Sequence, residues 1–219
     1  MENKSFGNYF PIMLDLSKFK ALVIGGGEIA TRKVYNLIEF NCKVTVIAPE
    51  ITRYLEILHN NNDIIWIKKE YEKGDINDFN FVFAATANPQ IDEIIAEECK
   101  IKNVLLNVAD VPHLCNFIMP ATIKRGDLTI SIGSQGRAPF YVKHLKDKLS
   151  TEFPEIFAEE VEMASFLRDK MLEYNLYYNE NIRNNIINDF FKLNISKILT
   201  NNGTTEAKAT IMRLINKYL

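Results

Sequence analysis

Short apolar runs alternate with segments of helical periodicity along the first half of the chain. The runs predict five strands, at residues 22–24, 44–47, 64–67, 81–85 and 104–106. Between the first two runs, apolar residues recur at helical spacing and predict a helix with one buried face. The buried face comprises Ala30, Val34, Leu37 and Ile38, and the face in water includes Arg32, Lys33 and Glu39. Strands that alternate with helices predict an α/β fold with a doubly wound parallel sheet.

The second half of the chain has a different pattern. Residues 128–132 predict a further strand, which enters a glycine-containing turn at 133–139 and then a helix. From Pro154 onward the apolar stripes predict helices alone. These stripes comprise Phe157, Val161, Ala164 and Met171, then Ile182, Ile186, Ile187 and Phe190, and, after a break at 201–203, Ala209, Met212 and Ile215. At the other end of the chain, residues 10–16 predict an extended lead-in strand.

The first apolar run leads into a glycine turn that fits a dinucleotide-binding motif. Gly25 allows the tight turn, Gly27 leaves room for a pyrophosphate, and Ala30 lets helix and strand pack closely. The amides of Glu28 and Ile29 would point at the anion from the helix N-terminus. A plain strand-to-helix turn is the alternative, but the helix and second strand that follow make a unit of about 30 residues, as a Rossmann-type fold requires.

The end of the second strand predicts which nicotinamide cofactor binds. The acidic residue that usually holds the adenosine ribose would fall near Ala48, which is not acidic. The backbone of Pro49 and the carboxylate of Glu50 are the available substitutes. Because no arginine stands at positions 48–51 to accept a 2′-phosphate, the sequence favours NAD over NADP.

The fourth and fifth strands carry further candidates, because the carboxyl ends of parallel strands lie along one edge of the sheet. Thr86 is expected near the nicotinamide ribose, with a cap of the following helix as the alternative. Asn107 lies at the same edge. Asp110 is the candidate base, with a turn residue before Val-Pro as the alternative. At the second glycine turn, backbone amides and Arg137 could receive a carboxylate or phosphate.

Composition excludes several classes of function. The 219 residues are 47% hydrophobic and 25% charged, which is enough to bury a core, and the net charge of −2 argues against a nucleic-acid partner. We expect no membrane span, because no apolar run approaches about 18 residues. The first residues lack the apolar core of a signal peptide, so a cytoplasmic protein is expected. Cysteines and histidines show no metal-ligand spacing, and Cys42 and Cys99 are expected in the core.

Several ordered motifs together resemble the siroheme synthase family. They lie between about residue 8 and residue 150, at residues 10–16, 23–33, 84–86, 107–110, 117–120 and 125–128. The resemblance implies an NAD-binding Rossmann domain at 1–112, a dimerisation region at 113–150 and a helical domain at 151–219. It also implies a homodimer, NAD-dependent dehydrogenation of precorrin-2 to sirohydrochlorin and, in bifunctional members, Fe²⁺ insertion to give siroheme.

The resemblance also implies roles for individual residues. Glu28 and Ile29 match the amides that contact the pyrophosphate, Pro49 and Glu50 the contacts to the adenosine ribose, and Asp110 the catalytic aspartate. Candidate contacts to the tetrapyrrole, which carries eight carboxylates, are Asn107, Arg125, Ser134 and Arg137. Ser134 falls where some members have a phosphorylatable serine. Its turn departs from the Ser/Thr-rich pattern that is more usual in the family.

Two other classes of function stay open. A non-enzymatic NAD-sensing module would need an acid at position 48 and no carboxylate beyond the fifth strand, and neither condition holds in this sequence. A dehydrogenase of a small alcohol would need a lysine, tyrosine or histidine proton relay, for which His113 is the best candidate.

Overall fold

The computed structural model describes residues 8–219, which form two compact units. The first unit comprises the described residues up to Met119 together with Gln135–Arg137. The second comprises Pro120–Ser134 and Ala138–Leu219. The chain therefore enters the second unit at Pro120, returns to the first at Gln135–Arg137 in the second glycine turn, and enters the second again at Ala138.

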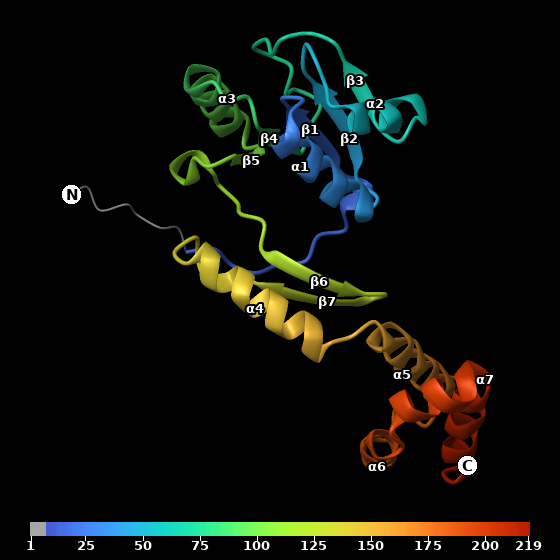
Figure 1. Ribbon diagram of the computed structural model, residues 1–219. Coiled ribbons are helices and arrows are strands. Elements are labelled where there is room, and N and C mark those ends of the chain that lie inside the picture. The colour runs from blue at the N-terminus through green and yellow to red at the C-terminus, as the bar shows by residue number, and fades with distance from the viewer. Residues whose placement is uncertain (1–7) are drawn as a thin grey trace. The chain divides into compact units, whose positions relative to one another are not determined.

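A five-stranded parallel sheet is the centre of the first unit (Figure 1), and it confirms the predicted α/β fold. Its strands are β1 (Lys20–Ile24), β2 (Lys43–Ile47), β3 (Ile65–Ile67), β4 (Phe81–Ala84) and β5 (Leu105–Val108), in the order β3-β2-β1-β4-β5. In the register of the sheet, Val23 of β1 pairs with Val46 on one side and Phe83 on the other. The order reverses at β1, so a ligand crevice is expected at the carboxyl ends of β1 and β4.

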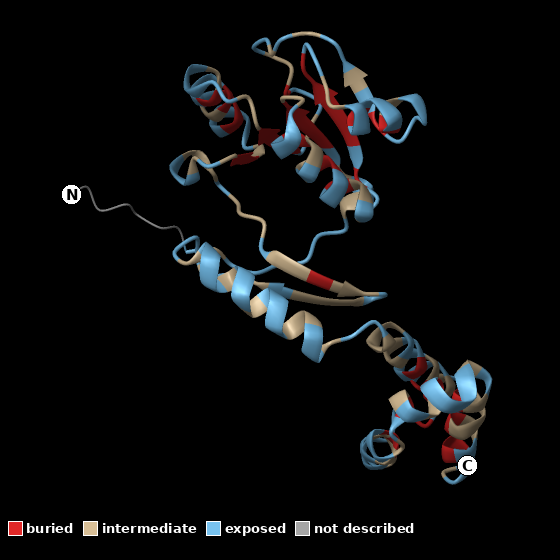
Figure 2. Cartoon of the chain, viewed as in Figure 1, coloured by how far each residue is buried: buried red, intermediate tan, exposed pale blue. Residues whose placement is uncertain are grey.

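Helices cover both faces of this sheet. They are α1 (Glu28–Glu39), α2 (Arg53–Asn60) and α3 (Pro89–Lys102). One core cluster joins α1 and α2 to the face that carries Val23 and Phe83, and a second joins α3 to the face that carries Leu22 and Val82. Buried residues are concentrated in the strands, as Figure 2 shows. Strands enclosed on both faces read as unbroken apolar runs, which is why the sequence predicts them well.

The lead-in strand predicted at residues 10–16 is wrong. These residues form no strand; instead Asp15 caps a short 3₁₀ helix, η1 (Leu16–Lys18), by accepting a hydrogen bond from the Ser17 amide. Phe10 and Met13 are 83% and 74% exposed. Apolar side chains alone do not make a strand where no neighbouring strand offers backbone partners.

The second unit begins with an antiparallel hairpin of β6 (Ala121–Arg125) and β7 (Leu128–Ile132). Gly126, with φ of +57°, turns the hairpin, and a Cβ on it would lie 3.1 Å from the Cβ of Ala158. Helix α4 (Pro139–Glu152) follows and contains no buried residue, as its pale blue and tan ribbon in Figure 2 shows. The hairpin has one buried residue, Ile123.

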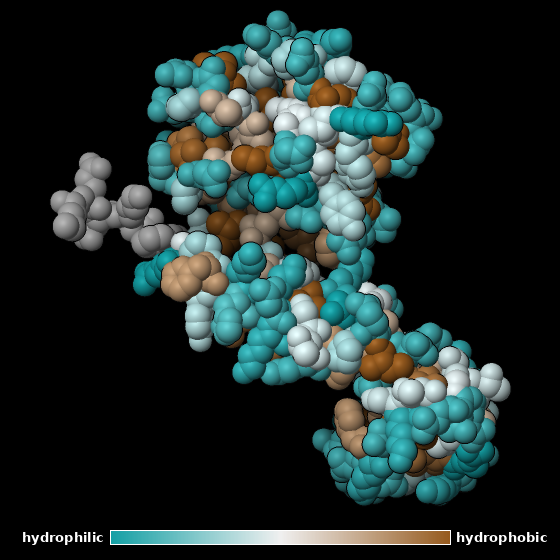
Figure 3. Space-filling model, in the orientation of Figure 1, coloured by the Kyte–Doolittle hydropathy of each residue, from teal (hydrophilic) through white to brown (hydrophobic). Residues whose placement is uncertain are grey.

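The remaining helices are α5 (Ile156–Glu173), α6 (Glu180–Lys192) and α7 (Ile195–Asn216), and they enclose a separate core. The stripe predicted on α5 is confirmed in part: Met171 is buried and Phe157 and Val161 are half-buried, but Ala164 is exposed. Met163 and Leu167, which were not predicted, are buried as well. Helix α7 is interrupted at Gly203, whose φ of +78° and ψ of 177° are not helical, which confirms the break predicted at 201–203. Hydrophilic side chains dominate the visible surface of these helices (Figure 3). Within the described part of the chain, no helix is long and apolar enough to span a bilayer.

Candidate functional site

The glycine turn after β1 brings three backbone segments together. Gly25 has a φ of +113°, and a Cβ there would lie 2.2 Å from the carbonyl oxygen of Ala85. A Cβ on Gly26 would lie 1.9 Å from the carbonyl oxygen of Glu50. Gly27 differs, because a Cβ there would meet no atom within 4 Å. Packing therefore requires the first two glycines, whereas Gly27 leaves space beside its backbone, which a pyrophosphate needs.

Helix α1 begins directly at this open glycine. Gly27 is its N-cap, and the first helical hydrogen bond is donated by the Thr31 amide to the Gly27 carbonyl at 2.9 Å. The amides of Glu28 and Ile29 precede that bond and point out of the helix end, where the helix dipole is positive. Ala30 is fully buried against the sheet. The turn and the helix end together fit a dinucleotide phosphate.

The carboxyl end of β2 lies beside the same turn. Pro49 and Glu50 are exposed, and Thr52, which caps α2, donates its amide to the Gly26 carbonyl at 3.0 Å. The Ala48 carbonyl accepts a hydrogen bond from the Trp66 indole at 2.9 Å. These contacts fix the path of the loop, and the Glu50 side chain remains exposed next to the glycine turn.

Thr86, after β4, makes the contacts of a helix cap. Its hydroxyl donates to the carboxylate of Asp92 at 2.8 Å and accepts from the Asn88 amide at 3.0 Å. Asn88 caps α3, and Pro89 occupies its first turn. Asp92 is 6% exposed, so this hydroxyl satisfies a nearly buried carboxylate. The position of Thr86 near a nicotinamide ribose stays a prediction.

Asp110 lies two residues beyond β5 in a loop with a fixed path. Its φ is +58°, the left-handed conformation that Asp and Asn tolerate better than other side chains, and it is exposed. The Cys115 sulfur accepts a hydrogen bond from the Val108 amide at 3.1 Å, and the Leu106 amide donates to the Asn116 side chain at 2.7 Å. The loop between them includes the 3₁₀ helix η2 (Pro112–Leu114). Such a loop can present one carboxylate in a constant position.

Lys33 is the residue that the sequence places wrongly. It was expected in water, but it is partly buried, and its ammonium donates to the Asn107 side-chain oxygen at 3.0 Å and lies 5.9 Å from the centre of the Phe83 ring. Asn107 is buried and donates its amide group to the Phe117 carbonyl at 3.2 Å. The pKa of Lys33 is below its ordinary value, mainly because of burial, with the charge of Arg32 adding to the decrease and that of Asp110 opposing it. The spacing of Lys33, three residues after Ala30 and four before Leu37, could have signalled a position bordering the buried face.

The candidates beyond β5 belong to two different units. Arg125 donates from Nε to the Phe153 carbonyl at 2.8 Å and pairs with Glu155 at 3.2 Å, so its guanidinium holds the end of α4. The Ser134 hydroxyl accepts from the Ala138 amide at 3.0 Å at the start of α4. Arg137, which falls in the first unit, is exposed. Contacts of these residues with a substrate stay predictions.

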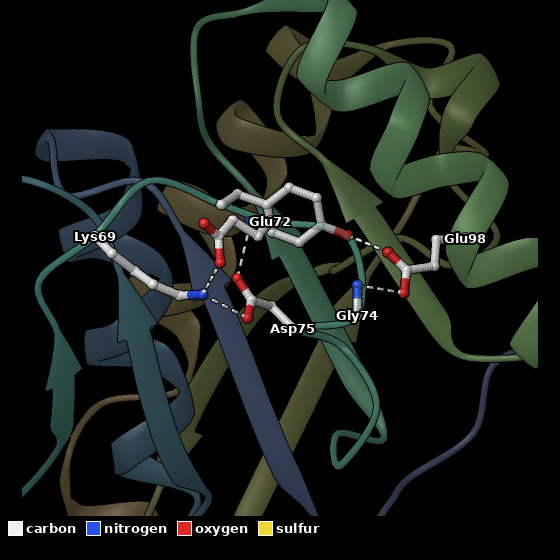
Figure 4. A network of polar contacts seen from close by, with 6 residues as sticks. Lys69, Glu72, Gly74, Asp75 and Glu98 are labelled. Carbon is white, nitrogen blue, oxygen red and sulfur yellow. Dashed lines mark hydrogen bonds and ion pairs between the residues drawn. The ribbon is translucent and has the colours of Figure 1, made fainter.

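A polar network fixes the connection from β3 to β4 (Figure 4). The Glu98 carboxylate, 3% exposed on α3, accepts hydrogen bonds from the Tyr71 hydroxyl and from the Gly74 amide at 2.9 Å. Lys69 bridges Glu72 and Asp75 at 3.0 and 2.8 Å. The network ties this long connection to α3 and so supports β4, which carries Ala85 to the glycine turn.

Within the described residues, neither a disulfide nor a metal-ligand cluster is part of the site. All three cysteines are free, and Cys42 and Cys99 are buried as predicted. Within residues 8–219, no three His, Cys, Asp or Glu side chains gather where they could hold a metal ion.

Comparison with known proteins supports the interpretation of the first unit as a dinucleotide-binding domain. Residues 12–121 match the model of a protein family described as "Putative NAD(P)-binding". In the solved structures, the chain resembles "SirC, precorrin-2 dehydrogenase" with a TM-score of 0.72 and 23% identity, over 94% of this chain and 100% of that one. At this identity the likeness shows a shared fold.

Sequence relatives carry the name siroheme synthase. The protein of Ruthia magnifica is 35% identical over 76% of this chain and 35% of its own length, and that of Vesicomyosocius okutanii is 33% identical over 95% of this chain and 44% of its own length. The chain therefore spans less than half of these relatives. The predicted resemblance to siroheme synthases is confirmed, and the chain belongs to the NAD(P)-binding family whose model it matches.

Proposed function

We propose that this chain is an NAD-dependent precorrin-2 dehydrogenase, which produces sirohydrochlorin for siroheme biosynthesis. The observation that carries the proposal is the combination of an open dinucleotide turn at Gly27 with the exposed carboxylate of Asp110 on a fixed loop, both at the carboxyl edge of one sheet. The names of the relatives, siroheme synthase and precorrin-2 dehydrogenase, supply the substrate.

In this proposal some residues of the chain bind the cofactor and another accepts a proton. The amides of Glu28 and Ile29 bind the pyrophosphate, and the exposed loop of Pro49 and Glu50 binds the adenosine ribose. When bound, NAD⁺ supplies the acceptor for a hydride from the reduced macrocycle. Asp110 accepts the proton lost from a neighbouring position, so that two electrons and two hydrogens leave the substrate together. Orientation at a fixed edge contributes much of the rate.

NAD is proposed in preference to NADP. The carboxylate of Glu50 stands exposed beside the glycine turn, where it can bind ribose hydroxyls and repel a 2′-phosphate. Titration of both cofactors against intrinsic fluorescence tests this preference. Tighter binding of NAD is expected, and equal or tighter binding of NADP would refute it.

A homodimer is part of the proposal. A hairpin with one buried residue and a helix with none cannot form a core by themselves, since an isolated hairpin is marginal in water. Phe140 and Tyr141 on α4 are 77% and 54% exposed. A second copy of the chain would cover these side chains.

The direct test of the function is a spectrum. The purified chain is incubated with NAD⁺ and enzymatically prepared precorrin-2, and sirohydrochlorin and NADH are followed by absorbance. Equal amounts of the two products are expected. Absence of both, with a folded protein that binds NAD, would contradict the proposed function and would favour an NAD-sensing module.

A further inference from the structure

The Lys33 ammonium is a partly buried charge without a carboxylate partner. Among residues 8–219, no Asp or Glu is in ion-pair contact with Lys33. Its hydrogen-bond acceptor is the neutral Asn107 side chain, and its other close neighbour is the Phe83 ring. A charge removed from water without a counterion is costly. Such a cation is therefore suited to an anion that arrives from outside.

The orientation of Asn107 directs this cation. Asn107 uses its amide group on the Phe117 carbonyl, so its side-chain oxygen is the end that faces Lys33. An ammonium has three N–H donors, and Asn107 occupies one of them. The buried asparagine thus holds the long lysine side chain in one place, and donors remain for another acceptor.

The position of Lys33 relates it to the proposed reaction centre. Asn107 precedes Asp110 by three residues along the chain, and Lys33 and Asp110 are close enough for their charges to interact. The backbone of Lys33 lies five residues into α1 from that of Glu28, about 7.5 Å along the helix axis from the proposed pyrophosphate site. This separation distinguishes it from the amides that would bind the cofactor phosphates.

We propose that Lys33, held by Asn107, binds one carboxylate of the polycarboxylate tetrapyrrole and so places the macrocycle beside Asp110. The inference rests on the proposed function and adds a substrate contact that the glycine motif does not contain. Lysine offers a charged, compact donor that can follow a carboxylate on a flexible side arm. The interaction would act in binding and would leave proton transfer to Asp110.

The test compares sirohydrochlorin binding by three variants, followed by quenching of protein fluorescence. Lys33→Met keeps the length of the side chain without its charge and should weaken binding by roughly 10-fold or more, the usual size of a lost charge-assisted hydrogen bond. Lys33→Arg should restore part of it. Lys43→Met, at an exposed position at the start of β2, makes the same change of net charge and should bind as the wild type does.

Further measurements separate the other outcomes. NAD affinity of Lys33→Met should stay within about twofold of wild type, and thermal melting verifies that each variant is folded. Equal sirohydrochlorin binding by wild type and Lys33→Met would overturn the inference while the proposed function stands. A matching loss of NAD affinity would overturn it too, by assigning Lys33 to a cofactor phosphate. Failure of the wild type to bind sirohydrochlorin would overturn both. If Lys33→Met does not fold, sirohydrochlorin binding by the wild type and by Lys33→Arg is measured at increasing salt instead. A charge-based contact should weaken as salt rises to about 0.5 M, because charges are then screened over a few ångströms. Affinities that do not change with salt would contradict the contact.

Discussion

Gly26 lies so close to Glu50 that a Cβ on the glycine would stand 1.9 Å from the Glu50 carbonyl oxygen. The Thr52 amide, two residues further on, donates to the Gly26 carbonyl at 3.0 Å. The loop proposed to bind the ribose and the turn proposed to bind the pyrophosphate are therefore one packed structure. Neighbouring glycines in this turn have different tasks, since Gly26 serves packing and Gly27 leaves space.

Substitution of the two glycines should separate folding from binding. Gly26→Ala should lower the melting temperature strongly, because backbone atoms cannot move away from the new methyl group. Gly27→Val should remain folded, since its φ of −81° suits any residue and its Cβ meets no atom, at a cost of about 1 kcal/mol for the weaker N-cap. It should lose NAD binding, because its side chain occupies the pyrophosphate path. Calorimetric titration of folded Gly27→Val with NAD checks this, and wild-type affinity would show that the phosphate lies elsewhere.

The Tyr71–Glu98 contact predicts a particular loss of stability at alkaline pH. Burial, followed by the hydrogen bond to Glu98, raises the pKa of Tyr71 above its ordinary value. The unfolded chain therefore releases this proton first, so the contribution of Tyr71 to stability is complete below about pH 10 and declines as the pH rises further. Tyr71→Phe should cost about 1–3 kcal/mol at neutral pH by leaving the buried Glu98 short of a donor.

Urea unfolding between pH 7 and 11 measures this effect. The stability difference between wild type and Tyr71→Phe should be constant up to about pH 10 and shrink above it. Tyr178→Phe, at a tyrosine that is 76% exposed, serves as the control and should match the wild type throughout. A difference that widens with pH would mean that the sign of the Tyr71 shift is wrong.

Helix α4 should carry the contact between two copies of the chain. Sedimentation at micromolar concentration is expected to give twice the chain mass of 25.2 kDa. Phe140→Glu should shift the protein toward monomer, because it puts a charge on an exposed apolar position of α4. Phe191→Glu makes the same change on α6, where the phenylalanine is 78% exposed, and should leave the dimer intact. A monomeric wild type would remove the proposed partner of α4.

Sequence patterns predicted the sheet because its strands are enclosed on both faces. The runs that become β1, β2 and β4 consist mainly of apolar residues that the structure buries, and the helix after β1 buries Ala30, Val34 and Leu37 as expected. Pattern reasoning succeeded only in part on α5, which is apolar around much of its circumference. Periodicity cannot select one face there, and the helices packed against α5 decide that Met163 and Leu167 are buried.

Some residues of the candidate site could likewise be predicted from the sequence, and others could not. Glycines and the start of α1 could be found because a motif specifies backbone geometry. The spacing of Lys33 could indicate a position at the border of the buried face of α1. Its contacts with Asn107 and Phe83, which are 74 and 50 residues away in the sequence, could be found only from the fold. Arg125 is predicted to contact the substrate, and that stays a prediction. Only the fold could show that its guanidinium also donates to the Phe153 carbonyl.

Asp110 is the proposed base, and its backbone conformation determines which substitution tests its charge without disturbing the loop. Asn tolerates the left-handed conformation at φ +58° as Asp does, so Asp110→Asn removes the charge without adding strain. Asp78→Asn, at an exposed position before β4, makes the same chemical change away from the carboxyl edge and serves as the control. Both variants should melt near the wild-type temperature and bind NAD as the wild type does.

The decisive measurement is the rate of sirohydrochlorin formation from precorrin-2 and NAD⁺ per folded molecule of Asp110→Asn. A general base in the proposed role predicts a fall of roughly 100-fold or more, with Asp78→Asn at the wild-type rate. A folded Asp110→Asn protein that turns over as fast as the wild type would contradict the account and leave Asp110 as a residue that shapes the turn.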